Sequence, residues 1–394
     1  TTDPDRVSSG GDWNVLANMF ESLLGRDQNG LLAPELATDY TVSEDGLVYD
    51  FTLRDNVTFH NGDAFTAEDV VFSFERAMDP ELKFNYVSWA VGKIASVEAT
   101  GDHAVRITLK ERTPTFDKDL KPFFPIVPKN YIEEVGNDAF LEAPVGTGPF
   151  RFVSREIQQN IVLHSYENYW GGAPKVDQVV FRFIAEPSTQ AAELQSGRID
   201  IASALPLGML DTLKKANNLD IVTTPGPTAV VLRYNEKTGI TTNKDVRRAL
   251  TMAVDRDAII KQILKGYAKP IASFQGELSF GNDPALKPLP FDTAGARKLL
   301  QQAGVKPGAS VQLDFRGTDP TFREVAQAVA GYLQAAGVRV NLKPYETAVL
   351  VNDIIPNGRT GEMFHMPWGG WTRRSVSGVS GFFRHPVSAV ATSG

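Results

Sequence analysis

The segment from Leu31 to Pro80 places the tightest constraint on the fold, because it joins several unrelated local signals in one fixed order. Two sets of residues alternate along this segment, with the period of a strand that has one buried face: Leu47, Tyr49, Phe51 and Leu53 in one set, and Val48, Asp50 and Thr52 in the other. The turn "SEDG" precedes this strand and the turn "HNGD" follows it. Thr66 and Asp69 then have the spacing of a capping box, and one helical face carries Val70, Val71, Phe74, Ala77 and Met78. The segment predicts a strand, a turn and a helix.

The same segment resembles the signature of the family 5 extracellular solute-binding proteins, the peptide, nickel and opine receptors of ABC importers. Further motifs keep the order of that family: "PVGTGPF" (144–150), "AAELQSGRIDIA" (191–202), "NKDVRRALTMAVDRDAII" (243–260) and "FDTAGARKLLQQAGV" (291–305). Together these matches extend over about nine-tenths of the chain, while the last 20 or so residues do not match.

The resemblance implies an α/β fold with the two lobes of a periplasmic binding protein (type II, cluster C-like), an extra inserted domain and a truncated second lobe. The first lobe is expected at 1–37 and 153–227, and the inserted small α+β domain at 38–152. The second lobe is expected at 228–394, with an atypical C-terminal part. Solute is expected to bind between the lobes, and hinge closure then favours the form that the transporter recognises.

Patterns outside the motifs predict further elements. A helix is expected from about Asp12 to Leu24, and Asp255 is expected to cap the start of another. The clearest unit lies at 311–342, where two alternating runs flank an apolar helical face. This pattern predicts a strand, a helix and a second strand, joined as a parallel crossover.

Composition excludes several classes of protein. The chain has 394 residues, a net charge of −7 and a pI near 5.4, which argue against a nucleic-acid-binding surface. The absence of cysteine excludes disulfides, thiolate zinc sites and a cysteine nucleophile. No apolar run approaches the ~18 to 20 residues that cross a bilayer, and no signal peptide precedes Thr1. The resemblance implies a periplasmic protein whose signal has been removed.

Against the family pattern, both ends of the chain are expected to be incomplete. The segment from Arg373, "RRSVSGVSGFFRHPVSAVATSG", has neither a helical nor a strand period. A reading-frame change after Thr372 is one hypothesis for this segment, and a divergent loop of the family is the other.

The sequence offers little chemistry for catalysis. It lacks the G-x-S-x-G elbow, the Walker A loop and the dinucleotide fingerprint, and its five histidines lie far apart. We expect no enzyme activity, no cofactor and no metal site, although a zinc site built from distant residues stays open. Two alternatives to a receptor are a truncated receptor without transport activity and, more distantly, a hydrolase on an α/β scaffold.

Six residues are candidates for ligand contact: Trp13, Trp89, Asn235, Arg316, Trp368 and Trp371. The resemblance places the first three near the ligand. An indole supplies a flat apolar face and one N–H donor, and the glycines of "WGGW" allow close approach of the backbone. Arg316 follows a predicted strand at the carboxyl edge of a sheet, where it can hold a carboxylate or phosphate through two hydrogen bonds. For each candidate, packing or turn formation within its own lobe is the alternative.

One departure from the family bears on the solute. In peptide-binding relatives, an aspartate lies within two residues after the "GWT" pattern and pairs with the ligand's α-ammonium. At these positions this chain has Arg373 and Arg374. Like charges repel in a dry cleft, so inward-facing arginines favour an anionic ligand.

The expected function is therefore that of a receptor, which binds a peptide or peptide-like solute and delivers it to the membrane permease of an ABC transporter. The resemblance implies a monomer that binds no nucleic acid. An opine, an oligosaccharide, a metal chelate and a small anion are the alternative ligands.

Overall fold

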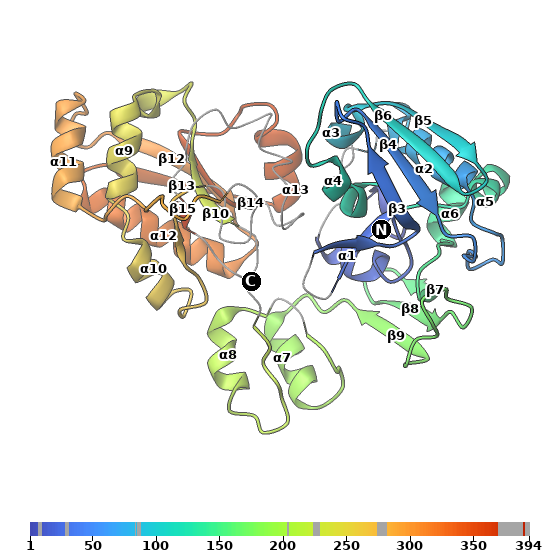
Figure 1. Cartoon of the computed structure of the whole chain (residues 1–394). Helices are drawn as coiled ribbons and strands as arrows, with labels where there is room; N and C mark the ends of the chain where they lie inside the picture. Colours follow the sequence, from blue (N-terminus) through green and yellow to red (C-terminus); the bar gives the residue numbers. More distant parts are fainter. Residues whose placement is uncertain are drawn as a thin grey trace. The chain divides into compact units, whose positions relative to one another are not determined.

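The structure is a computed structural model that describes residues 1–6, 10–27, 31–82, 84, 88–202, 205–223, 229–273, 282–368 and 389–390. It forms two compact units, Thr1–Ile184 (unit 1) and Ala185–Gly394 (unit 2), shown in Figure 1. Each unit combines helices with strands, so the predicted α/β fold class is confirmed. The finer division into two lobes and an inserted domain stays a prediction.

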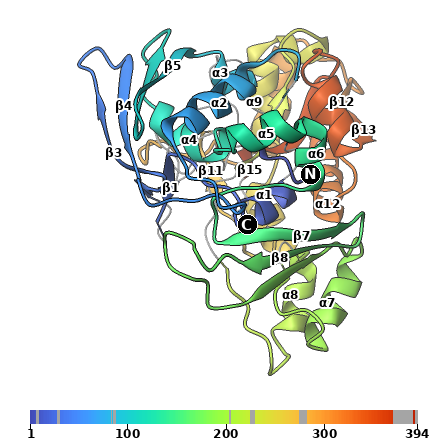
Figure 2. The ribbon, with the colours of Figure 1, turned by 90° about the vertical axis from the view of Figure 1, so that its right-hand side faces the viewer.

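Unit 1 is built around two separate antiparallel sheets and one short strand pair. Its helices are η1 (Pro4–Arg6), α1 (Gly10–Leu16), α2 (Ala67–Met78), α3 (Ser88–Val91), α4 (Phe116–Phe123), α5 (Lys129–Val135) and α6 (Asn137–Glu142). One sheet has the order β3 (Ala37–Val42), β4 (Val48–Leu53), β6 (Ala104–Leu109), β5 (Ile94–Gly101). The other has the order β7 (Phe150–Glu156), β8 (Asn160–Ser165), β9 (Gln178–Arg182), and the pair is β1 (Leu24–Arg26) with β2 (Leu32–Pro34). Figure 2 shows the β3–β4 hairpin well separated from β7 and β8.

The signature segment folds as its sequence predicts. Strand β4 turns Phe51 and Leu53 into the core of unit 1, where they are 2% and 4% exposed. Thr66 and Asp69 form the capping box of α2, since the Asp69 carboxylate accepts the Thr66 backbone N–H at 2.9 Å. Phe74, on the apolar face of α2, is fully buried. Local periodicity and capping were enough to predict this segment, although its core partners include Val105 and Ile107 of the distant strand β6.

The first helix is shorter than predicted. Helix α1 ends at Leu16 and does not continue to Leu24, which already lies in β1. Beyond the helix, the carbonyl of Met19 accepts the backbone N–H of Gly148, in the "PVGTGPF" motif, at 2.9 Å. The chain leaves the helix because a distant segment supplies the hydrogen bonds that a further helical turn would have made.

The glycines of "PVGTGPF" permit two close contacts. A Cβ atom on Gly146 would lie 2.1 Å from the Met19 carbonyl oxygen, so only glycine fits this position. His60, from the "HNGD" turn, accepts the Gly146 N–H at Nδ1 (3.2 Å) and donates from Nε2 to the Gly148 carbonyl (2.9 Å). Burial lowers the pKa of His60 to about 4, so the ring is neutral at neutral pH. Two motifs far apart in the sequence are thereby joined.

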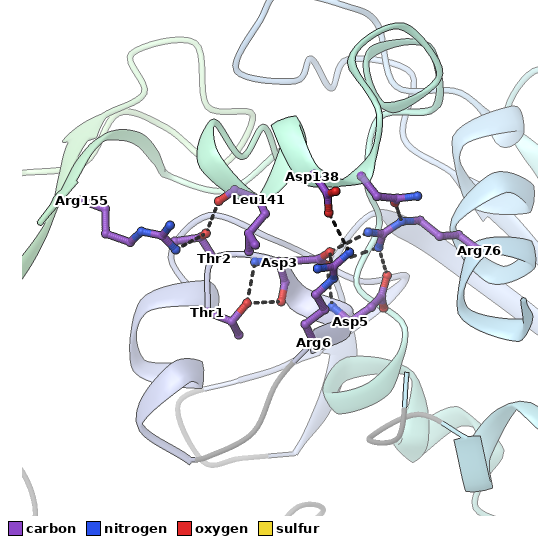
Figure 3. A network of polar contacts seen from close by, with 10 residues as sticks. Thr1, Thr2, Asp3, Asp5, Arg6, Arg76, Asp138, Leu141 and Arg155 are labelled. Carbon is purple, nitrogen blue, oxygen red and sulfur yellow. Dashed lines mark hydrogen bonds and ion pairs between the residues drawn. The ribbon is translucent and has the colours of Figure 1, made fainter. Parts of the chain in front are cut away.

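A buried ionic network ties the N-terminal segment to α2 (Figure 3). Arg76 donates to both carboxylate oxygens of Asp3, at 3.3 and 2.6 Å, and also to Asp5. Arg6 pairs with Asp3 at 3.4 Å and with Asp138 at 3.6 Å. Burial raises the pKa of Asp5 to about 7; the guanidinium of Arg76 opposes this rise and the charge of Asp3 adds to it. Two carboxylates therefore share one fully buried guanidinium.

A second buried carboxylate lies just after α1. Glu21 is 2% exposed and accepts hydrogen bonds from the Tyr169 hydroxyl (2.8 Å) and the Trp170 indole N–H (2.9 Å). The guanidinium of Arg54 lies 3.9 Å from the centre of the Trp170 ring. Burial raises the pKa of Glu21 to about 7, and the neighbouring charge of Glu35 adds to the rise.

Unit 2 contains a six-stranded mixed sheet. The strand order is β11 (Pro270–Ile271), β15 (Ala389–Val390), β10 (Ala229–Tyr234), β14 (Met363–Trp368), β12 (Ser310–Arg316), β13 (Arg339–Tyr345). The helices are α7 (Pro187–Gln195), α8 (Leu207–Leu213), η2 (Gly239–Thr242), α9 (Lys244–Met252), α10 (Arg256–Gln262), α11 (Thr293–Gln302), α12 (Pro320–Ala335), α13 (Thr347–Val349) and η3 (Leu350–Ile354). Strand β12 runs parallel to β13 and to β14, whereas β10 runs antiparallel to β14.

The predicted strand–helix–strand unit is confirmed as β12, α12 and β13. Alternating residues of β12, among them Leu313 and Phe315, pack against the apolar face of α12 in the main core of unit 2. Asp255 caps α10 as predicted, because its carboxylate accepts the Ala258 backbone N–H at 2.9 Å. Within the described ranges, no helix combines the length and the apolar character that crossing a membrane requires.

Candidate functional site

The carboxyl ends of three neighbouring strands meet at one edge of the unit 2 sheet. Arg316, the last residue of β12, pairs in register with Tyr345, the last residue of β13. Strand β14 runs parallel to β12 and ends at Trp368. Ligands of open α/β sheets gather at such an edge, because loops and helix N-termini converge there. The structure therefore brings two of the predicted residues, Arg316 and Trp368, to one edge.

Arg316 is held from two sides. Its Nη2 donates to Oδ2 of Asp319 at 3.0 Å, and its guanidinium carbon lies 4.7 Å from the centre of the Phe322 ring. Oδ1 of Asp319 accepts the Thr321 backbone N–H at 2.8 Å and so caps α12. Arg316 Nε is buried and has no partner among the described residues. The side chain as a whole is 29% exposed, so an incoming group can reach part of it, although Nε itself is buried.

Asp314, two residues before Arg316 in β12, is bonded elsewhere. It is completely buried and accepts hydrogen bonds from the Gly361 backbone N–H and the Gln312 side chain, both at 2.7 Å. Burial raises its pKa, and these two hydrogen bonds oppose the rise. The ion pair of Arg316 is therefore with Asp319.

His365, in the middle of β14, was not among the candidates. It is 2% exposed, lies in register with Phe315, and its ring meets the Phe322 ring edge to face, with centroids 5.2 Å apart. Neither ring nitrogen has a hydrogen-bond partner in the part of the chain that the structure describes. Burial lowers the pKa of His365 to about 4, with the charge of Arg316 adding to the effect. A histidine within a strand-like run just before "WGGW" was the only signal available.

Asn235 lies at the opposite edge of the sheet. Because β10 is antiparallel to β14, its last residue pairs with Met363, where β14 begins. At about 3.3 Å per residue, five steps along β14 separate this point from Trp368 by roughly 16 Å. The Asn235 side chain donates to the Thr360 carbonyl (3.2 Å) and accepts the Lys237 backbone N–H (3.0 Å). The structure does not bring Asn235 together with Arg316 and Trp368, and its contacts are those of a turn residue.

The remaining candidates are tryptophans. Trp13 belongs to α1 and packs, partly buried, against the core cluster of α1, β7 and β8 in unit 1. Trp89 belongs to α3 and Trp368 to β14, but their side chains fall outside the described part of the structure. Trp371 and the arginines that follow it lie outside the described residues altogether. Ligand contact by all four tryptophans stays a prediction.

The described part of the chain shows no constellation for metal binding. No group of three or more His, Cys, Asp or Glu side chains within it lies close enough together to hold a metal ion. What the carboxyl edge offers is a partly exposed arginine with an unpaired Nε–H, packed against the Phe322 ring. This chemistry suits recognition of an anionic group.

Comparison with known proteins identifies the family. The model of "Bacterial extracellular solute-binding proteins, family 5 Middle" matches residues 32–388. The match includes most of the segment after Thr372, which the motif comparison had left outside the family pattern, so that expectation is wrong. The glutathione-binding protein GsiB of Pectobacterium atrosepticum is 30% identical over 388 residues, covering 97% of this chain and 74% of the relative.

Solved structures give the same result. The periplasmic binding protein DppA of Helicobacter pylori, in complex with the peptide STSA, superposes with a TM-score of 0.83 at 29% identity, covering 93% of this chain and 75% of that chain. NikA of Brucella suis, in complex with Fe(III)-EDTA, gives a TM-score of 0.84 at 26% identity, covering 94% and 77%. The predicted periplasmic-binding-protein fold is confirmed by these superpositions. The chain belongs to the family 5 extracellular solute-binding proteins and is a solute-binding receptor of an ABC-type importer, not an enzyme.

Proposed function

We propose that the chain binds a peptide or peptide-like solute and that Arg316 holds a carboxylate of that solute. The observation that carries the proposal is the partly exposed guanidinium of Arg316 at the carboxyl edge of the sheet, with an Nε–H that has no partner among the described residues. Leaving such a donor without a partner costs about 1 to 3 kcal/mol, a cost that a bound carboxylate would offset. Relatives named for glutathione and for a peptide complex support this class of solute.

The tryptophans are the proposed apolar part of the site. Trp368 ends the strand next to that of Arg316, and Trp371 follows it by three residues. Trp13 and Trp89, in unit 1, are the proposed contacts from that unit. Asn235 is retained as a predicted contact, although its turn explains the residue without a ligand.

The proposed setting follows from the family. We propose a periplasmic monomer that delivers its solute to a membrane permease and binds no nucleic acid. The net charge of −7 is consistent with the absence of a nucleic-acid surface.

A thermal-shift screen tests the proposal. A panel of short peptides, glutathione, opines, oligosaccharides, metal chelates and small anions is added to the folded chain, and the melting temperature is measured. A cognate solute at a hundred times its Kd should add about 2.7 kcal/mol of stability and raise the melting temperature. If only opines, sugars or chelates raise it, the peptide assignment is wrong. If no member of the panel raises it, solute binding by this chain is in question.

Variants locate the contact. R316Q should weaken binding of a carboxylate solute on the order of 10- to 100-fold, since hydrogen bonds to a charged group are lost. The matched control is R248Q, because Arg248 is an exposed arginine of α9 in the same unit. Equal affinities of R316Q and R248Q would remove Arg316 from the site.

A further inference from the structure

Three side chains from three elements form a stack beneath the carboxyl edge of the unit 2 sheet. Phe322, in the first turn of α12, is in the middle. The Arg316 guanidinium lies 4.7 Å from its ring centre, and the His365 ring meets it edge to face at 5.2 Å and 70°. The stack joins the end of β12 and the middle of the neighbouring strand β14 to the first turn of α12.

The stack fixes the plane of the guanidinium. Asp319 binds one end of it at Nη2, and its central carbon lies over the Phe322 ring, so rotation about the last side-chain bonds is restricted. An arginine that is already ordered loses less entropy when it binds a second anion. The restriction leaves Nε, which has no partner among the described residues, in one orientation.

His365 occupies a position where a charge would be costly. The charged groups that act on it are Arg316 from β12 and Asp319 from the start of α12. Burial and Arg316 lower the pKa of His365, and Asp319 opposes this only in part. A neutral imidazole supports the Phe322 ring without repelling the guanidinium on the same ring, whereas an imidazolium would repel it.

We propose that Phe322 and His365 are positioning residues for Arg316, holding its guanidinium in one orientation so that its exposed part meets a carboxylate of the solute. The proposal rests on the function proposed above, in which Arg316 binds that carboxylate. Neither Phe322 nor His365 need touch the solute. The role requires His365 to be uncharged, so acid should loosen the guanidinium.

The first test observes the guanidinium and needs no ligand. The full chain is labelled with nitrogen-15 arginine, the Arg316 Nε–H signal is assigned with R316K, and its exchange with water is measured at about pH 6. Loss of a partly exposed cation–π contact predicts exchange several-fold faster in F322L than in the wild type. H365Q should show a smaller increase. The matched control is F291L, which loses an edge-to-face contact with Tyr332 at 5.8 Å elsewhere in unit 2 and should exchange like the wild type.

The second test follows the Arg316 Nε signal of the wild type and of H365Q as the pH is lowered. As the pH falls toward about 4, protonation of His365 should shift the Arg316 Nε signal in the wild type but not in H365Q. A merely structural role for His365 would not produce this difference. Equal exchange in the wild type, F322L and H365Q, or the same acid-induced shift with and without His365, would overturn the proposal.

Calorimetry separates this inference from the proposed function. The probes are reduced glutathione, which carries carboxylates, and its diethyl ester, in which they are blocked. We expect F322L to bind glutathione several-fold more weakly than F291L does. Equal affinities for glutathione in F322L and F291L would overturn the positioning role. If the wild type binds neither probe, the carboxylate assignment loses support, and the exchange measurements still decide whether Phe322 and His365 position Arg316.

Discussion

Replacing Glu21 with glutamine removes a buried ionisable group and keeps its shape. Glu21 is 2% exposed and accepts one hydrogen bond each from Tyr169 and Trp170. The glutamine oxygen can accept the indole N–H, and its nitrogen can donate to the Tyr169 hydroxyl, so both partners remain bonded. E21Q therefore isolates the effect of the charge.

The sign of the effect follows from the pKa values of the two states. Glu21 ionises near its ordinary value of 4.5 in the unfolded chain, whereas burial raises its pKa to about 7 in the folded chain. The folded state therefore holds the proton more tightly, and the stability that Glu21 contributes is fully present below pH 4.5 and lost as the pH rises through 7. The difference between the two pKa values corresponds to about 3 kcal/mol. Relative to the wild type, the unfolding free energy of E21Q should be higher at about pH 8 than at about pH 4.5 by this amount.

Urea unfolding followed by tryptophan fluorescence at both pH values measures this difference. Amide hydrogen exchange resolved by mass spectrometry assigns the change to unit 1, which matters because two compact units need not unfold together. The matched control is E68Q, because the Glu68 side chain is 62% exposed and its pair with Lys129 lies on the surface. The E68Q difference should stay within about 0.5 kcal/mol across the same range. The same E21Q difference at both pH values would show that Glu21 is not the group whose ionisation costs stability.

Three further predictions concern unit 1. H60Q removes the contribution of His60, so its unfolding free energy relative to the wild type should be lower at pH 6.5 than at pH 4 by about 3 kcal/mol, measured by urea unfolding at both pH values. G146A should destabilise by 3 kcal/mol or more, on the order of a severe overpacking, while G208A, in an open and exposed position of α8, should be neutral or stabilising by up to about 1 kcal/mol; melting temperatures compare the two. R76M should cost about 3 to 5 kcal/mol, because it leaves two buried aspartates without their cation, and a loss below 1 kcal/mol would show that the network does not hold the N-terminal segment.

The fold was predictable where a segment's own periodicity decides its structure. The capping box at Thr66 and Asp69, the cap at Asp255 and the β12–α12–β13 crossover were all predicted from local patterns and are confirmed. The end of α1 was not predictable in this way. Its helical pattern continues past Leu16, but the competing hydrogen bond comes from Gly148, over 100 residues later in the chain.

The candidate site shows the same limit. Arg316 could be placed at a carboxyl edge because it ends an alternating run followed by a helix. Asn235 directly follows β10, but β10 runs antiparallel to β14, so this end of β10 lies at the other edge of the sheet. Strand direction depends on the topology of the whole sheet and leaves no local trace. His365 was missed for a related reason, since its importance comes from Phe322 and Arg316, which meet it only in the folded chain.

Glu21 and His60, two side chains of unit 1 whose pKa values are shifted by burial, act in opposite directions on the stability of unit 1. Glu21 favours the folded state at low pH, because burial raises its pKa to about 7. His60 favours it at high pH, because burial lowers its pKa to about 4, below the ordinary value of 6.5. Each contribution is about 3 kcal/mol, and the two titration windows overlap between pH 4.5 and 6.5, so the slopes cancel there. The stability of the wild-type unit should therefore change little across this range as far as these two groups determine it. E21Q should become more stable as the pH rises through the same range, and H60Q less stable, because each variant leaves the other group uncompensated.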